Sequence, residues 1–390
     1  MKKVRFATIG TSAITELFLK GAVLEPRFEY AGAYSRDAGN AIRFAREHGA
    51  GRHFSSLEEL AACEDIDAVY VASPNSLHFG HTMAMLEGGK HVLCEKAFAS
   101  NARQVDVMCR TARERGLALM EAMKTTHSPT FARVAENLPK IGRVRRYFAS
   151  YCQYSSRYDR FKNGDVANAF RAEFSNGSLM DIGVYGVYPM VALFGRPQSV
   201  LSDAVLLHTG VDGQGTLVCR YDGMDAVVVH SKIADSSLPS EIQGENGRIV
   251  IDRINAIDSA RIIFRDGTQE DISAPHERYD MVYDQFVDHV EVIVGRIANF
   301  SFHFRELDRF LVFCGRTAAV PAAGGIFLQD VARAFPELQR SGYRHVVHDF
   351  DAERCRIGTG QHRSEEDRFE VTSRVAFRIF DFCHNRLKMI

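Results

Sequence analysis

Short apolar runs and amphipathic segments alternate strictly along the first third of this 390-residue chain, and this alternation constrains its fold more than any other feature. The apolar runs are typical of buried strands, and the segments between them carry apolar side chains at helical spacing. The predicted elements are, in chain order, a strand at 4–9, a helix at 13–22, a strand at 30–35, a helix at 38–48, a strand at 68–72, a helix at 77–86, a strand at 91–94, a helix at 101–115 and a strand at 117–120. Strands that alternate with helices form a parallel sheet with helices on both faces, and its ligands bind beyond the carboxyl ends of the strands. We therefore predict an α/β fold with a doubly wound parallel sheet over residues 1–122.

The pattern changes near residue 144. From there, strands follow one another with few helices between them, at 144–154, 200–207, 217–221, 225–233 and 248–252. Turn signals separate several of these runs, at Asp212-Gly213, Asp222-Gly223 and Asn246-Gly247. Short connections join antiparallel strands, so we predict a second, α+β domain over residues 123–320 that is built on a largely antiparallel sheet.

The predicted strand at 225–233 has apolar side chains on both faces. Ala226 and Val228 point to one side, and Val227 and Val229 point to the other. A strand of this kind is covered on both sides. Helices of the same chain can cover one side, so we expect the other side to pack against a second copy, in a homodimer or a higher homo-oligomer.

The end of the chain has a weaker pattern. Phe300, Phe304, Leu307 and Leu311 have helical spacing, which indicates a helix at 300–316. Residues 321–390 show neither helical nor strand periodicity, so this tail is left without a predicted structure or role.

Composition and charge exclude several classes of function. The formal net charge is -1, so the chain lacks the basic field that binds nucleic acid or an anionic membrane surface, and no apolar run approaches the ~18 residues that span a bilayer. The eight cysteines are scattered without a C-x-x-C pair, as in reduced proteins, so we expect a cytoplasmic protein. His78 and His81 lie three residues apart with no second ligand cluster, which favours one face of a helix over a metal site.

A glycine turn follows the first predicted strand. Gly10, Thr11, Ser12, Ala13 and Ile14 match only the first glycine of the G-x-G-x-x-G dinucleotide motif, and a plain tight turn would have a similar sequence. The turn nevertheless directs backbone N–H groups at the start of a helix toward a site for pyrophosphate, and its small side chains allow close approach. We predict that these five residues bind the cofactor and that the first domain is a Rossmann domain.

The second predicted strand ends in Ser35 and Arg36. A hydroxyl followed by a guanidinium suits the 2′-phosphate of NADP, because arginine binds phosphate in a bidentate fork. NAD would instead require an acid that binds the ribose hydroxyl, and Asp37 is available for that role. We predict NADP as the preferred cofactor and NAD as the alternative, in which Arg36 is only a solvated surface charge.

Several motifs at predicted strand ends resemble one known family. They are Cys94-Glu95-Lys96-Ala97, Ser73-Pro74-Asn75 with His78 shortly after it, Glu121-Ala122-Met123, and Gly177-Ser178-Leu179-Met180-Asp181-Ile182-Gly183. Over residues 1–297 the chain is similar to the glucose-fructose oxidoreductase / inositol dehydrogenase / rhizopine-catabolism (Gfo/Idh/MocA) family, in which a proline stands at the position of Ala97. The resemblance implies a nicotinamide cofactor, bound by Ser73, Pro74, Asn75, His78, Glu95, Lys96 and Met123 in addition to the residues above.

A tyrosine replaces a histidine of the family's pattern. The family's aspartate, here Asp181, is followed four residues later by histidine, whereas this chain has Tyr185. The chain therefore looks most similar to the dimeric dihydrodiol dehydrogenase branch, in which tyrosine is the proposed acid/base. Residues four apart share one helix face, and a tyrosine with an ordinary pKa of ~10 needs a nearby cation to become a base near neutral pH. We predict Lys96, Asp181 and Tyr185 as the catalytic residues, with Lys96 as that cation.

These residues predict an NAD(P)-dependent oxidoreductase. Its expected reaction is hydride transfer between nicotinamide and a hydroxyl-bearing carbon of a sugar, a polyol or a cyclic diol. Two alternatives stay open on the same fold, a biliverdin-type or imine reductase and a catalytically silent NADP-binding regulatory protein, because a fold alone does not imply turnover.

Overall fold

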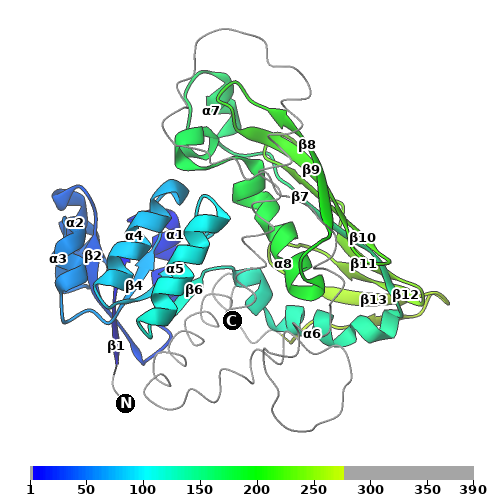
Figure 1. The fold of residues 1–390 in the computed structure, drawn as a ribbon, viewed down its shortest axis with the longest axis horizontal. Helices are drawn as coiled ribbons and strands as arrows, with labels where there is room; N and C mark the ends of the chain where they lie inside the picture. Colours follow the sequence, from blue (N-terminus) through cyan, green and yellow to red (C-terminus); the bar gives the residue numbers. More distant parts are fainter. Residues whose placement is uncertain (1–2, 276–390) are drawn as a thin grey trace, which may run out of the picture.

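The computed structural model describes residues 3–275, and these form two sheets that lie side by side (Figure 1). The first sheet has the order β3-β2-β1-β4-β5-β6, and all of its strand pairs are parallel. Its elements are β1 (Val4–Ile9), α1 (Ala13–Ala22), β2 (Phe28–Tyr34), α2 (Ala38–Glu47), β3 (Arg52–Phe54), α3 (Leu57–Ala62), β4 (Ala68–Val71), α4 (Asn75–Glu87), β5 (His91–Cys94), α5 (Ala102–Glu114) and β6 (Leu119–Glu121). The prediction of a doubly wound parallel sheet is confirmed.

The second sheet has the order β14-β13-β12-β11-β7-β10-β9-β8, and only the pair β7–β10 is parallel. Its strands are β7 (Val144–Cys152), β8 (Ser199–Leu206), β9 (Asp212–Arg220), β10 (Asp225–Ser231), β11 (Ser240–Gly244), β12 (Gly247–Ile251), β13 (Ala260–Phe264) and β14 (Gln269–Asp271). The chain reaches this sheet through α6 (Pro129–Asn137), and α7 (Tyr158–Lys162) follows β7. The prediction of a largely antiparallel sheet in an α+β unit is confirmed.

The predicted turn at Asp212-Gly213 is wrong. Both residues belong to β9, and the turn comes earlier, where Gly210 adopts a positive φ of 82°. Asp212 looks like a turn residue in the sequence, but its carboxylate has a different use. It accepts a hydrogen bond of 2.6 Å from the backbone N–H of Leu179, at the start of the helical segment that precedes β8.

One helical segment packs on the face of the second sheet that points toward the first sheet (Figure 1). It starts with a π-helical turn at Leu179–Gly183 and continues as α8 (Val184–Phe194). Gly186 lets this helix approach the sheet closely, because a Cβ there would lie 2.7 Å from Cγ1 of Val228. The stretch Ala172–Phe194 contains an 18-residue window that is apolar enough to cross a membrane, with a mean hydropathy of 1.3, yet 72% of that window is buried inside the protein. It is therefore a core helix.

The strand β10 alternates as predicted. Ala226, Val228 and His230 are buried on the side of α8, whereas Val227 and Val229 are half-buried on the opposite side. In the described part of the chain, no helix packs on that opposite face, which points away from the first sheet in Figure 1.

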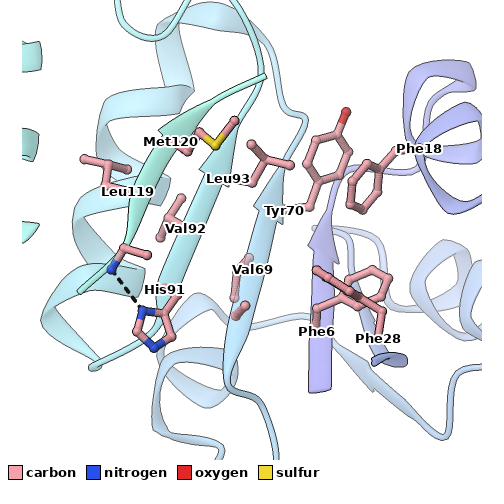
Figure 2. A pocket seen from close by; sticks show the side chains of 12 residues that line it. Phe6, Phe18, Phe28, Val69, Tyr70, His91, Val92, Leu93, Leu119 and Met120 are labelled. Atoms are coloured by element: carbon pink, nitrogen blue, oxygen red, sulfur yellow. Dashed lines mark hydrogen bonds between the residues drawn. The ribbon is translucent and has the colours of Figure 1, made fainter. Parts of the chain in front are cut away.

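The first sheet has an apolar pocket on the face that carries α1 (Figure 2). Phe18 of α1 stacks on Tyr70 of β4, with ring centroids 3.9 Å apart. The polar groups at this pocket already have partners, since the Tyr70 hydroxyl donates to Glu95 and the Nδ1 atom of His91 accepts from the backbone of Ala118. The pocket is therefore a gap in a core rather than a site for chemistry.

The helix predicted at 300–316 and the tail at 321–390 lie outside the described residues. The division of the chain at residues 122–123 and at residue 320 remains a prediction.

Candidate active site

The glycine turn after β1 is built around one close approach. Gly10 has a φ of 113°, and a Cβ at this position would lie 2.6 Å from the carbonyl oxygen of Ala72, so only glycine fits. Ser12 has an extended backbone just before α1, and its side chain makes no capping hydrogen bond. Ala13 and Ile14 begin the helix. The small side chains and the start of α1 fit a pyrophosphate group, which binds well at a helix N-terminus.

The end of β2 is linked to this turn by Asn40. Its side-chain Nδ2 donates to Oγ1 of Thr11 at 2.8 Å and to Oγ of Ser35 at 3.4 Å. Asp37 accepts a 2.6 Å hydrogen bond from the backbone N–H of Asn40, and so caps α2. Asp37 is thus engaged at the helix start, whereas Arg36 beside it is exposed. This arrangement leaves Ser35 and Arg36 as the groups that can receive a phosphate.

His78 supports the cofactor site from behind. Its ring is fully buried in α4, with Nδ1 2.8 Å from the carbonyl oxygen of Ala97 and Nε2 2.7 Å from that of Ser73. Burial lowers its pKa to about 4, so the ring is neutral near pH 7. A neutral ring has one N–H and donates to only one of these carbonyl oxygens, but both nitrogens lie against the backbone and neither is left for a cofactor. His81 contacts Oγ of Ser73 at 2.9 Å in the same way.

Asn75 joins the two halves of the protein. It is the first residue of α4 and follows Pro74. Its Nδ2 atom donates to the carbonyl oxygen of Ser175 and to Oδ1 of Asn176, both at 3.1 Å. Asn75 was predicted to bind the cofactor. In this structure its side-chain amide binds the loop before the π-helical turn.

Glu95 and Met123 lie below the surface of the site. Glu95 accepts a 2.5 Å hydrogen bond from the Tyr70 hydroxyl, and burial raises the pKa of its carboxyl. Met123 is fully buried just after β6. The peptide bond between Lys96 and Ala97 is cis. These residues shape the segment that carries Lys96.

Lys96 meets both other predicted catalytic residues. Its Nζ atom lies 2.8 Å from Oδ1 of Asp181 and 3.0 Å from the carbonyl oxygen of Asp181. The same atom lies 5.6 Å from the centroid of the Tyr185 ring. Asp181 sits in the π-helical turn and Tyr185 in the first turn of α8. The structure therefore brings together the three residues that the motifs single out.

The charges of this cluster are strongly coupled. Burial opposes the carboxylate of Asp181, but the ammonium groups of Lys96 and Lys232 outweigh it and hold its pKa well below the usual range. Burial also opposes the Lys96 ammonium, but Asp181, Tyr185 and Glu95 raise its pKa above the usual range. At neutral pH the cluster holds two ammonium groups and one carboxylate.

The pKa of Tyr185 differs from the prediction made from the sequence. Burial raises the pKa of its phenol, and the ammonium of Lys96 offsets this only in part. The expected lowering toward neutral pH is therefore absent, since burial disfavours the phenolate more strongly than one cation stabilises it. Tyr185 is a neutral phenol, which suits a proton donor.

Two residues of the cluster were not predicted from the sequence. Lys232 follows β10, and its ammonium binds Oδ2 of Asp181. Tyr151 of β7 packs edge-on against Tyr185, with ring centroids 5.8 Å apart. Both positions are close to the ends of strands in the second sheet. A polar residue at a strand end is a signal that could have drawn attention to Lys232.

Comparison with known proteins identifies the family. Residues 4–123 match an oxidoreductase family with an NAD-binding Rossmann fold, and residues 138–250 match the GFO/IDH/MocA C-terminal domain. Over 281 residues the chain is 51% identical to the scyllo-inositol 2-dehydrogenase (NADP(+)) of Bacillus subtilis (strain 168), which covers 72% of this chain and 86% of that relative. The chain belongs to the Gfo/Idh/MocA family.

Other members of the family are similar in sequence to parts of this chain. A trans-1,2-dihydrobenzene-1,2-diol dehydrogenase of Xenopus tropicalis is 34% identical over 56% of this Gfo/Idh/MocA chain and 65% of its own. The crystal structure of a 3-ketoreductase from Actinomadura kijaniata, in complex with TDP-benzene and NADP, is 26% identical, with a TM-score of 0.65 over 80% of this chain and 95% of its own. The predicted resemblance is confirmed, and the protein is an NAD(P)-dependent oxidoreductase.

Proposed function

We propose that this Gfo/Idh/MocA enzyme transfers a hydride between NADP and a hydroxyl-bearing carbon of a cyclic polyol, a sugar or a cyclic diol. The observation that carries the proposal is the position of the Lys96 ammonium, which reaches both the carboxylate of Asp181 and the ring of Tyr185. A secondary alcohol must lose a hydride and a proton when it is oxidised, so it needs a charged hydrogen-bond donor and a proton carrier. The 51% identity to a scyllo-inositol 2-dehydrogenase makes an inositol ring the first substrate to test.

The cofactor supplies or accepts the hydride when it is bound. We assign its pyrophosphate to the turn at 10–14 and its adenosine phosphate to Ser35 and Arg36. A side chain at Gly10 would fill the space that this turn leaves open. The remaining chemistry falls to the protein's own side chains.

Lys96 and Tyr185 act on the substrate oxygen in this proposal. The Lys96 ammonium donates a hydrogen bond to that oxygen and stabilises the negative charge that develops on it. The Tyr185 phenol is protonated at neutral pH, so it hands its proton to a carbonyl oxygen during reduction. During oxidation the phenol first loses its proton to solvent, and the resulting phenolate takes the proton of the substrate hydroxyl. Asp181 remains a carboxylate and orients Lys96, because it stays ionised between two ammonium groups.

The test is turnover with a panel of inositols, sugars and cyclic diols. Absorbance of the reduced nicotinamide is followed with NADP and with NAD. We expect turnover with at least one cyclic polyol. A protein that binds NADP but oxidises or reduces no member of the panel would favour the silent regulatory alternative. Turnover restricted to biliverdin or an imine would favour the second alternative, a biliverdin-type or imine reductase.

Arg36→Ala is expected to weaken NADPH binding by about ten- to a hundredfold and to leave NADH binding nearly unchanged. A lost charge-assisted hydrogen bond is worth about 1.5–3 kcal/mol. Fluorescence titration with both cofactors measures the effect. Arg46→Ala, at an exposed residue in the last turn of α2, is the matched control. Equal losses for NADPH and NADH would contradict the assignment of Arg36 to the 2′-phosphate.

The open face of the second sheet supports a dimer. Leu201, Val205 and Val218 are 59%, 49% and 42% exposed there, and the register aligns Leu201 with Val218 and Val227. Exposed apolar surface of this kind favours pairing with a second copy. We propose a homodimer or higher homo-oligomer through this face, in a cytoplasmic enzyme whose described cysteines form no disulfide.

Val218→Glu is expected to dissociate this assembly. A carboxylate buried at an apolar interface costs on the order of 2 kcal/mol or more per copy, which weakens association by at least tenfold. Light scattering at micromolar concentration measures the mass. Val23→Glu, at a 74% exposed residue beyond α1, is the control that should leave the mass unchanged. A monomeric wild-type protein would rule the assembly out.

A further inference from the structure

Two ammonium groups share one carboxylate in the candidate active site. Lys96 binds Oδ1 of Asp181, and Lys232 binds Oδ2. They come from different sheets, since Lys96 follows β5 and Lys232 follows β10. The family motifs include Lys96 and Asp181 but not Lys232.

Lys232 is the more deeply buried of the two lysines. Its side chain is 5% exposed, compared with 18% for Lys96. Its ammonium also lies 5.1 Å from the centroid of the Phe170 ring, which is fully buried. Burying a cation is costly unless it is paired, so a lysine retained at such a position needs the carboxylate of Asp181.

The second lysine changes the charge of the cluster. Lys96 and Asp181 alone would be a neutral pair, and the carboxylate would cancel most of the field of Lys96. With Lys232 the three groups carry a formal charge of about +1. Lys96 carries part of this surplus charge, and its Nζ atom lies 5.6 Å from the centroid of the Tyr185 ring.

We propose that Lys232 is a positioning residue of the active site, which occupies Oδ2 of Asp181 and so leaves the positive charge of Lys96 available to the substrate oxygen and to the hydroxyl of Tyr185. The proposal rests on the proposed function, in which Lys96 and Tyr185 act on that oxygen. It also assigns Asp181 a fixed role as an anion, because both of its oxygens bind cations.

The groups that face Tyr185 set the expected pH dependence. Lys96 lowers the pKa of its phenol, whereas Glu95, Tyr151 and Asp181 raise it together with burial. Tyr70 of β4 is close enough to interact with it as well. Removing Lys232 leaves more of the negative charge of Asp181 uncompensated, so the pKa of Tyr185 moves further up.

The experiment compares the pH profile of kcat/KM for polyol oxidation in the full-length wild-type enzyme, Lys232→Met, Lys232→Arg and Lys90→Met. One unit charge removed about 10 Å away shifts a neighbouring pKa by about one unit at an effective dielectric constant of about 20. Because oxidation needs the Tyr185 phenolate, kcat/KM rises with pH, and we expect this rise to move up by about one pH unit in Lys232→Met, with about a tenfold loss at neutral pH. Lys232→Arg keeps the charge and should retain the wild-type profile.

Lys90→Met is the matched control for losing a buried lysine. Lys90 is 7% exposed and precedes β5, at the opposite end of the strand from Lys96. Its loss should lower stability without moving the profile. A loss of activity in Lys232→Met without a shift, or an equal shift in Lys90→Met, would overturn the proposal and leave Lys232 with a structural role only.

A second measurement separates this proposal from the proposed function. If the wild-type enzyme turns over no substrate of the panel, the proposed function fails, but carbon-13 NMR of the Asp181 carboxyl still reports on Lys232. Lys232→Met should raise the pKa of Asp181 by about one unit or more, since an ammonium no longer holds Oδ2. An unchanged titration of Asp181 would overturn the role of Lys232 without reference to activity.

Discussion

Lys96→Met is expected to lower kcat/KM by about 10²–10⁴-fold while the affinity for NADP stays close to that of the wild type. Methionine keeps the length of the side chain and removes its charge, so the substrate oxygen loses its charged donor and Tyr185 loses its nearest cation. Asp181 keeps Lys232 as a partner, which avoids an unpaired buried carboxylate. The affinity for the cofactor is expected to persist, because the turn at 10–14, to which we assign the pyrophosphate, follows β1, whereas Lys96 follows β5.

Absorbance of reduced nicotinamide measures turnover in this test, and fluorescence titration measures cofactor binding. Lys90→Met again serves as the control, since it removes a buried lysine from the opposite end of β5. Turnover within about tenfold of the wild type in Lys96→Met would mean that the ammonium is not used in the reaction.

The first sheet was predictable because its signals are local. The predicted bounds of β1, α1 and β5 match the structure, and each of these elements is a single apolar or amphipathic run between turns. The strand β3 was missed because two of its three residues, Arg52 and His53, are polar and exposed, so the segment shows no apolar run. Strands that short carry too few residues to show an alternation.

The second sheet was predicted in outline but not in full. The strands β11, β13 and β14 were not identified, and the predicted turn at Asp212-Gly213 was wrong. Asp and Gly together favour a turn, but Asp212 is held in β9 by pairing with β8 and by its hydrogen bond to Leu179. Contacts of this kind join residues far apart in the sequence, so no local pattern reveals them.

The candidate site shows the same limit. Lys96 and Asp181 are 85 residues apart, and their resemblance to family motifs pointed to them before their contact was known. Lys232 has no such motif, and its role depends on how β10 pairs with β7 and β9. The net effect on Tyr185 depends on burial, which the sequence does not report. The raised pKa of its phenol was therefore not foreseen.

Tyr185→Phe is expected to lower kcat/KM by about 10²–10⁴-fold as well, because phenylalanine removes only the hydroxyl that carries the proton. The ring should keep its packing against Tyr151. The matched control is Tyr147→Phe, which removes a buried hydroxyl that donates to the carbonyl oxygen of Gly186 in the same helix. That control should cost about 1 kcal/mol of stability and leave turnover nearly unchanged.

The double variant Lys96→Met/Tyr185→Phe decides whether the two residues act as one unit. If the ammonium works mainly by tuning and positioning the Tyr185 hydroxyl, the double variant should be little slower than either single variant, because groups that act as a unit are non-additive. Steady-state kinetics of all four proteins at one pH measures the coupling. Additive losses would instead mean that Lys96 binds the substrate oxygen independently of proton transfer. Near-normal turnover in Tyr185→Phe would remove the tyrosine from the mechanism, and the proton carrier would then have to be sought at Lys96 itself, since Asp181 stays ionised between its two cations.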